Sequence, residues 1–128
     1  MHELPSGVEF HAATAILVSQ FLTERTQRVG FFHEIGNRLR PSGLLVTADI
    51  TPTPRDQHES LLGVWKQMMR YVGATEEQVE AMLASYGRDV VLLPTDEMEA
   101  LLKEAGFPAP VHFSQSLLIH AWYARGEK

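Results

Sequence analysis

Apolar residues along the chain gather in short continuous runs and in helical stripes, and the two patterns alternate. Residues 12–18 form a continuous run of apolar and β-branched residues, which is typical of a strand buried on both faces of a parallel sheet. Apolar positions from 29 to 39 then recur at helical spacing until Pro41, where the helix is expected to stop. A second apolar run follows at residues 44–48. Strand, helix and strand in this order predict a βαβ unit with a right-handed crossover.

The next segment breaks this rhythm with two helices. Residues 57–72 carry a broad apolar stripe, which predicts an amphipathic helix after a proline-rich loop. Thr75 and Gln78 have the spacing of a capping box, so we expect a second helix from there through Tyr86.

The last part of the chain predicts a helix and a hairpin. Residues 96–105 have acids in the first turn and a lysine near the end, as the helix dipole favours. Two strand-like stretches follow, at 109–113 and 116–124, with a turn expected at Ser114 and Gln115. We therefore predict that the last two strands pair antiparallel.

These elements make one α/β domain with three parts. Residues 1–52 hold the strand-helix-strand unit, 53–90 the inserted helices, and 91–128 the helix with the terminal β-hairpin. A chain of 128 residues is long enough to bury a core of its own.

Composition narrows the possible partners. Acidic residues outnumber Lys and Arg by 16 to 11, so there is no strong signal for nucleic-acid binding. No apolar stretch approaches the length of a membrane span, and there is no cysteine. The six histidines have no metal-site spacing, and we predict no bound metal. A cytoplasmic location is expected.

Four segments carry a family likeness. Residues 31–50 resemble the helix, turn and strand of class I S-adenosylmethionine-dependent methyltransferases, with Ser42 in place of the first glycine of the usual pair. Three further segments resemble that family's fourth strand, its sixth strand with the preceding helix end, and its seventh strand: ATAILVSQFL, LLKEAGFPAPVHF and LLIHAWYARG. The segments occur in the family's order. The nearest subgroup includes the tRNA wobble-uridine enzymes and many small-molecule methyltransferases.

The resemblance implies a partial Rossmann-like sheet, strands four to seven, with the last strand antiparallel. It also implies that the amino-terminal half, which binds most of the cofactor in the family, is not in this sequence: no G-x-G pair occurs, and no strand is expected before residue 12. The intact family uses S-adenosylmethionine to methylate an acceptor, here expected to be a small molecule. This chain alone is expected to bind no cofactor and to be inactive.

The loops after the first two strands supply the candidate site residues. By resemblance, Ser19 and Gln20 would contact the cofactor, while Phe21 and Thr51 would border the acceptor. Asp49 could act as a general base or a substrate hydrogen-bond acceptor. For each of these residues an ordinary structural role is the alternative; for Asp49 this is a carboxylate satisfied by backbone donors in the nearby loop.

Two further expectations concern surfaces. Trp65, on the inserted helix, could line the acceptor site or an oligomer contact, with core packing as the alternative. The strand at residues 12–18 would lie at an open sheet edge, so a non-catalytic module that self-associates through that edge is the alternative function.

Overall fold

The chain folds around one four-stranded sheet. The computed structural model describes residues 4–5, 7–52 and 54–127. The strands lie in the order β1-β2-β4-β3. Their bounds are β1 Phe10–Ile16, β2 Leu39–Ile50, β3 Val111–Ser116 and β4 Ile119–Arg125. Strand β2 runs parallel to β1, whereas β4 runs antiparallel to both of its neighbours. The predicted α/β sheet with an antiparallel last strand is confirmed.

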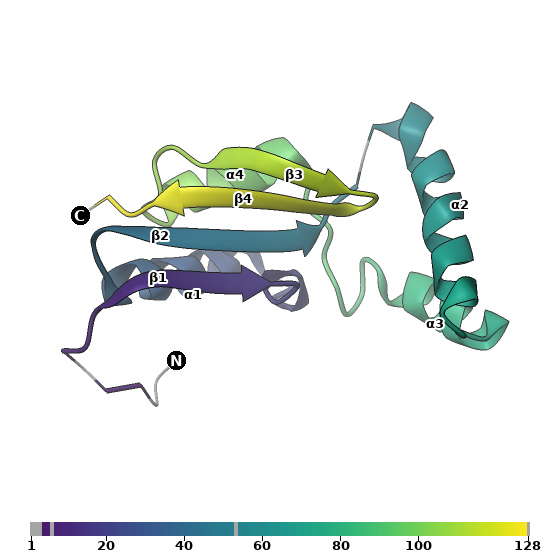
Figure 1. Cartoon of the computed structure of the whole chain (residues 1–128), viewed down its shortest axis with the longest axis horizontal. Coiled ribbons are helices and arrows are strands. Elements are labelled where there is room, and N and C mark those ends of the chain that lie inside the picture. Colours follow the sequence, from purple (N-terminus) through teal and green to yellow (C-terminus); the bar gives the residue numbers. More distant parts are fainter. Residues whose placement is uncertain (1–3, 6, 53, 128) are drawn as a thin grey trace.

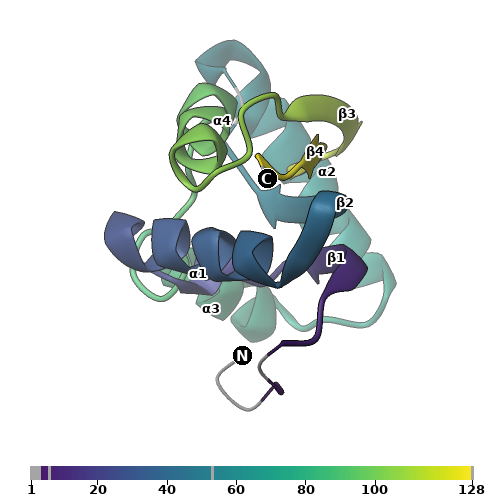
Figure 2. The ribbon, with the colours of Figure 1, turned by 90° about the vertical axis from the view of Figure 1, so that its left-hand side faces the viewer.

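Two helices cover one face of this sheet. Helix α1, Arg25–Arg38, connects β1 to β2, and α4, Thr95–Glu104, precedes β3. Figure 2 shows both helices on the same side of the strands. Between helices and sheet lies the main core, which has these fully or nearly fully buried members: Ala15, Phe32, Ile35, Leu39, Leu45, Met98, Leu101, Leu102, Ala105, Phe107, Trp122 and Ala124.

The first strand is less buried than its sequence predicts. Ala15 is the buried residue of β1, whereas Ala12, Thr14 and Ile16 are exposed, and Ile16 exposes 51% of its surface. The expectation of burial on both faces is therefore wrong for this chain. The physical reason is that β1 is an edge strand, and the described helices α1 and α4 cover only one face of the sheet.

The predicted proline turn lies inside a strand. Strand β2 begins at Leu39, so Pro41, Ser42 and Gly43 form an irregularity where the register with β1 shifts. A side chain on Gly43 would place its Cβ 2.8 Å from the backbone oxygen of Arg40, so only glycine fits this bend.

The inserted helical pair is confirmed at the end of the sheet. It comprises α2, Arg55–Tyr71, and α3, Glu76–Ser85 (Figure 1). The Thr75 hydroxyl accepts from Gln78 N at 3.2 Å, and the Gln78 side chain accepts from Thr75 N at 2.9 Å. The predicted capping box is present.

The hairpin turn lies three residues later than predicted. Ser114 and Gln115 belong to β3, and the chain turns at Leu117 and Leu118. Leu118 is fully buried in a second apolar cluster with Trp65 and Ile50, so packing places an apolar turn where polar residues were expected. In the described part of the chain, no helix has the length and apolar character needed to cross a membrane.

Candidate functional site

The carboxyl end of the two parallel strands brings together three of the predicted site residues. A short 3-10 helix, η1, Ser19–Phe21, follows β1, and Asp49 lies one residue before the end of β2. The Ser19 hydroxyl donates to one carboxylate oxygen of Asp49. The backbone N–H of Gln20 donates to the other at 3.1 Å. Both Asp49 oxygens therefore accept hydrogen bonds from residues of η1.

Gln20 links this pair to two other segments. Its side-chain oxygen accepts from the backbone N–H of Ile50 at 2.9 Å. Its backbone oxygen accepts from Val91 N at 2.9 Å. Gln20 thus joins η1, β2 and the segment between α3 and α4.

Arg28 on α1 completes the cluster and is absent from the predicted site residues. Its guanidinium donates to the Val91 backbone oxygen at 3.0 Å and to the Ser19 hydroxyl at 3.2 Å, and it lies 3.7 Å from an Asp49 oxygen. Only 1% of Arg28 is exposed. A sequence signal exists: Arg28 precedes Phe32 and Ile35 by four and seven residues, so it shares their buried helix face.

We call Ser19, Gln20, Arg28, Asp49 and the backbone of Val91 the Asp49 network. Burial raises the pKa of Asp49, although the Ser19 hydroxyl, the Arg28 charge and the Gln20 N–H each lower it. Burial also lowers the pKa of Arg28, against the opposing charge of Asp49. For both groups, loss of water outweighs the attraction between them, as is common for buried ion pairs.

The geometry agrees in part with the structural alternative for Asp49, because one of its two donors, Gln20 N–H, is a backbone group and the other is the Ser19 hydroxyl. Its side chain is 0% exposed and its oxygens already accept from this chain's own donors. In this conformation the network holds four segments together, and Asp49 has no open path to a substrate. Its role as a base stays a prediction.

The other predicted residues lie apart from the network. Phe21 exposes 59% of its surface at the outside of η1. Thr51 is buried, and its backbone N–H donates to Leu118 at 2.9 Å. Trp65 packs in the second apolar cluster. Trp65 is therefore packed in the interior of the chain, as the alternative interpretation of this residue expects.

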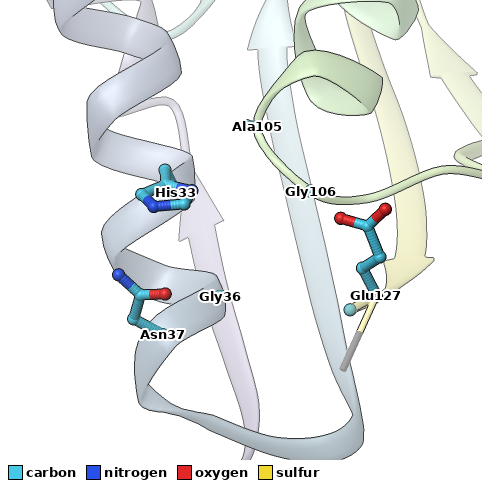
Figure 3. Close-up of a pocket in the computed structure, with 7 residues that line it drawn as sticks. His33, Gly36, Asn37, Ala105, Gly106 and Glu127 are labelled. Atoms are coloured by element: carbon cyan, nitrogen blue, oxygen red, sulfur yellow. The ribbon is translucent and has the colours of Figure 1, made fainter.

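Three cavities of the described chain lie away from the Asp49 network. One of about 120 Å³ lies between α1, the end of α4 and the carboxyl-terminal segment, and Figure 3 shows His33 and Asn37 facing Glu127 across it. No member of the Asp49 network lines it. Among the described residues, no group of three or more His, Asp or Glu side chains could hold a metal ion.

Solved structures share this fold. The pyocyanin biosynthetic protein PhzM matches with a TM-score of 0.67 and 13% identity over 98% of this chain. Human N-acetylserotonin methyltransferase, solved with S-adenosylmethionine, matches with 0.63 and 14% over 98%. An O-methyltransferase family protein from Burkholderia thailandensis matches with 0.60 and 13% over 94%. The fold is therefore methyltransferase-like.

The chain spans a minor part of these proteins: 32% of PhzM, 31% of the human enzyme and 31% of the Burkholderia protein. No protein-family model matches the sequence, and no curated protein matches it either.

Proposed function

We propose that this chain is the carboxyl-terminal half of an S-adenosylmethionine-dependent methyltransferase that methylates a small acceptor. The observation that carries the proposal is the coverage: 98% of the chain superposes on about a third of methyltransferases such as PhzM and the human enzyme.

Similar structures support the small-molecule acceptor. One is an O-methyltransferase family 2 protein from Planctomyces limnophilus in complex with apigenin, and it matches with a TM-score of 0.58. Another similar structure, with a TM-score of 0.57, is that of a pericyclic reaction enzyme, so this fold serves more than one chemistry. Methyl transfer is favoured because the sequence resemblance points to it independently.

The residues present do not fit S-adenosylmethionine by themselves. Ser19 and Gln20, the predicted cofactor contacts, are buried and bonded to Asp49, Ile50 and Val91. The sequence also has no G-x-G turn. Preorganised donors for the cofactor are missing, so we propose that the isolated chain is inactive.

Isothermal titration with S-adenosylhomocysteine tests this proposal in two arms. The first uses the 128-residue chain, where no binding tighter than about millimolar is expected. The second uses a fusion that places the part of PhzM preceding the matched segment before this chain, where micromolar binding is expected. Micromolar binding by the chain alone would reject the half-site, and no binding in either arm would reject methyl transfer.

A second candidate function is a non-catalytic module that associates with a second copy, and the outer edge of β1 favours it. Leu17 N donates to Ala48 O, so the odd residues of β1 bond to β2 and the even residues, Thr14 among them, direct their backbone groups outward. Strand β1, FHAATAI, has neither charge nor proline to block pairing. Light scattering after size exclusion should give about twice 14.4 kDa; a 14.4 kDa particle at all concentrations would reject this candidate.

A further inference from the structure

Strand β3 is an edge strand that pairs with β4, and none of its six residues is buried. Its ladder to β4 is interrupted between His112 and Ser114, where Phe113 is an extra residue without a register partner. A hairpin strand that buries so little surface is only marginally stabilised by backbone pairing. The side-chain contacts of β3 therefore matter for whether it stays on β4.

Three rings connect β3 to β4 on the sheet face that α1 and α4 cover. His112 of β3 stacks on Trp122 and on His120 of β4, with ring centroids 5.2 and 4.9 Å apart. His120 Nδ1 lies 2.9 Å from His112 Nε2, which is a hydrogen-bond distance. We call His112, His120 and Trp122 the ring stack. Two of its three rings are titratable near neutral pH.

The hydrogen bond between the two imidazoles tolerates one extra proton but not two. A neutral imidazole has one N–H and one acceptor nitrogen, so one ring donates and the other accepts in either tautomer. A cationic ring can still donate to a neutral one. When both rings are cationic, two N–H groups face each other at 2.9 Å and no acceptor is left between them. The contact between His112 and His120 therefore requires that one of them stays neutral.

The surroundings of His120 oppose a positive charge on its ring. The residue is 4% exposed, and its Nε2 has no hydrogen-bond partner among the described residues. A cationic ring would place an N–H at Nε2 without an acceptor, which is costly in a buried position. Burial, and after it the charge of His112, lower the pKa of His120. The docked strand therefore favours a neutral His120.

No nearby acid is free to compensate a charge on His120 within the described chain. On β2 its register partner is Asp49, whose charge already faces the buried cation Arg28 of α1. On β3 its register partner is Gln115, which is uncharged. The half-buried acid of α4, Glu99, takes part in none of the ion pairs of the described residues. The buried residues of α4 are apolar: Met98, Leu101 and Leu102.

We propose that the ring stack is a pH-sensitive contact that holds β3 on the sheet at neutral pH and releases it under mildly acidic conditions. In the released state water reaches both imidazoles, and each can take up a proton below about pH 6.5. The free energy of release falls as the pH drops, because the released state binds more protons than the docked state. Release uncovers the edge of β4, whose backbone groups can then pair with another strand.

Amide hydrogen exchange of the full chain at about pH 7.5 and about pH 5.5 tests the release. After correction for the intrinsic exchange rate, the protection of the β3 amides that bond to β4 should fall about three- to tenfold at the lower pH, as expected for one additional proton in the released state. This exchange should be insensitive to low urea, because release exposes little surface. Leu17 N, which donates to Ala48 O between β1 and β2, should instead follow the urea dependence of global unfolding. If the β3 amides have the same pH and urea dependence as Leu17, the proposal is overturned.

Two variants and one spectroscopic measurement assign the effect to the ring stack. His120→Phe keeps a buried ring that cannot take up a proton, so β3 should be equally protected at the two pH values. Glu99→Gln, the control, removes the half-buried acid of α4 and should leave the fall in protection unchanged. The ring nitrogen shifts of the parent protein give an answer that does not depend on how the variants fold: His120 should be neutral at about pH 5.5 as long as β3 is docked. A cationic His120 in the docked protein, an unchanged fall in His120→Phe, or loss of the fall in Glu99→Gln would overturn the assignment.

Discussion

The carboxyl end of β1 and β2 and the outer edge of β1 belong to one sheet, yet they differ in how their polar groups are satisfied. At the carboxyl end, the Asp49 network binds each charged group with partners from this chain. At the outer edge, the backbone groups of Thr14 and its even neighbours have no strand beside them in the described chain. Both Asp49 oxygens therefore have partners within this chain, whereas the outward backbone groups of β1 are open to a further strand.

The contrast explains what is unusual in β1. A continuous apolar strand is normally covered on both sides, and this one has its apolar Ile16 half exposed. The Asp49 network shows that the neighbouring segments are nevertheless fixed in place. The exposed apolar side chain and the open backbone groups therefore lie at the β1 edge and on the sheet face that α1 and α4 leave uncovered.

Removing the Asp49 carboxylate should cause the largest effect. Asp49→Ala leaves the Arg28 guanidinium buried without its counter-charge, which typically costs about 3–5 kcal/mol of the free energy of unfolding. Urea unfolding measures this loss. Glu104→Ala, which breaks an exposed ion pair with Arg25, is the control and should cost at most about 1 kcal/mol. Equal losses in both variants would show that the buried pair of Asp49 and Arg28 contributes no more to stability than an exposed ion pair.

Blocking the β1 edge should change association with little effect on the fold. Thr14→Pro removes an outward N–H without breaking the ladder to β2, so a dimer should become a monomer in light scattering. Gln115→Pro, on the outward side of the opposite edge strand β3, should leave the dimer intact. If both variants lose the dimer, or if neither does, the proposal that two copies pair through β1 is wrong.

A third test uses acid pH at the hairpin. Burial, and to a lesser extent the charge of His112, lower the pKa of His120, whose Nδ1 lies 2.9 Å from His112 Nε2. The unfolded chain therefore takes up this proton first, and the free energy of unfolding should fall as the pH drops below about 6.5. The loss is about 1.4 kcal/mol for each unit that separates the two pKa values.

His120→Phe isolates this contribution. Burial raises the pKa of Asp49, so this carboxyl takes up its proton more readily in the folded state. Its contribution to the free energy of unfolding therefore increases as the pH falls through the folded pKa, which is opposite to the contribution of His120. Urea unfolding gives the free energy of unfolding of both proteins at about pH 7 and about pH 5.5. Subtracting the two values at each pH removes the Asp49 effect, which both proteins share. Relative to the parent protein, the variant should become more stable at about pH 5.5 than at about pH 7; parallel profiles would show that His120 does not titrate as described.

The smallest effect is expected at the inserted helices. Thr75→Ala removes the cap of α3 and should cost about 1 kcal/mol. Thr75→Ser, which keeps the hydroxyl, should restore most of the stability. A loss as large as that of Asp49→Ala would show that α3 is coupled to the Asp49 network.

Local patterns in the sequence predict most of the elements. The capping box at Thr75, the helical spacing of α1 and the apolar runs of β1 and β2 each depend on neighbouring residues, so they can be found without the fold. The hairpin turn at Leu117 and Leu118 could not be predicted from neighbouring residues, because the burial of Leu118 against Trp65 depends on a distant helix.

The candidate site shows the same division. Ser19, Gln20 and Asp49 were predictable because loops after parallel strands meet at one edge of a sheet. The buried partner Arg28 is an exception to the rule that charged residues lie outside, and only its spacing with Phe32 and Ile35 signals it. The cavity at Glu127 depends on the closure of the carboxyl-terminal segment, which has no local pattern.

Amide hydrogen exchange at low protein concentration compares the two regions most directly. The N–H groups of Gln20, Ile50 and Val91 bond within the network, whereas that of Thr14 faces outward. We predict that the first three exchange only through global unfolding and that Thr14 exchanges far faster. Exchange of Gln20, Ile50 and Val91 at the rate of Thr14 would contradict the account.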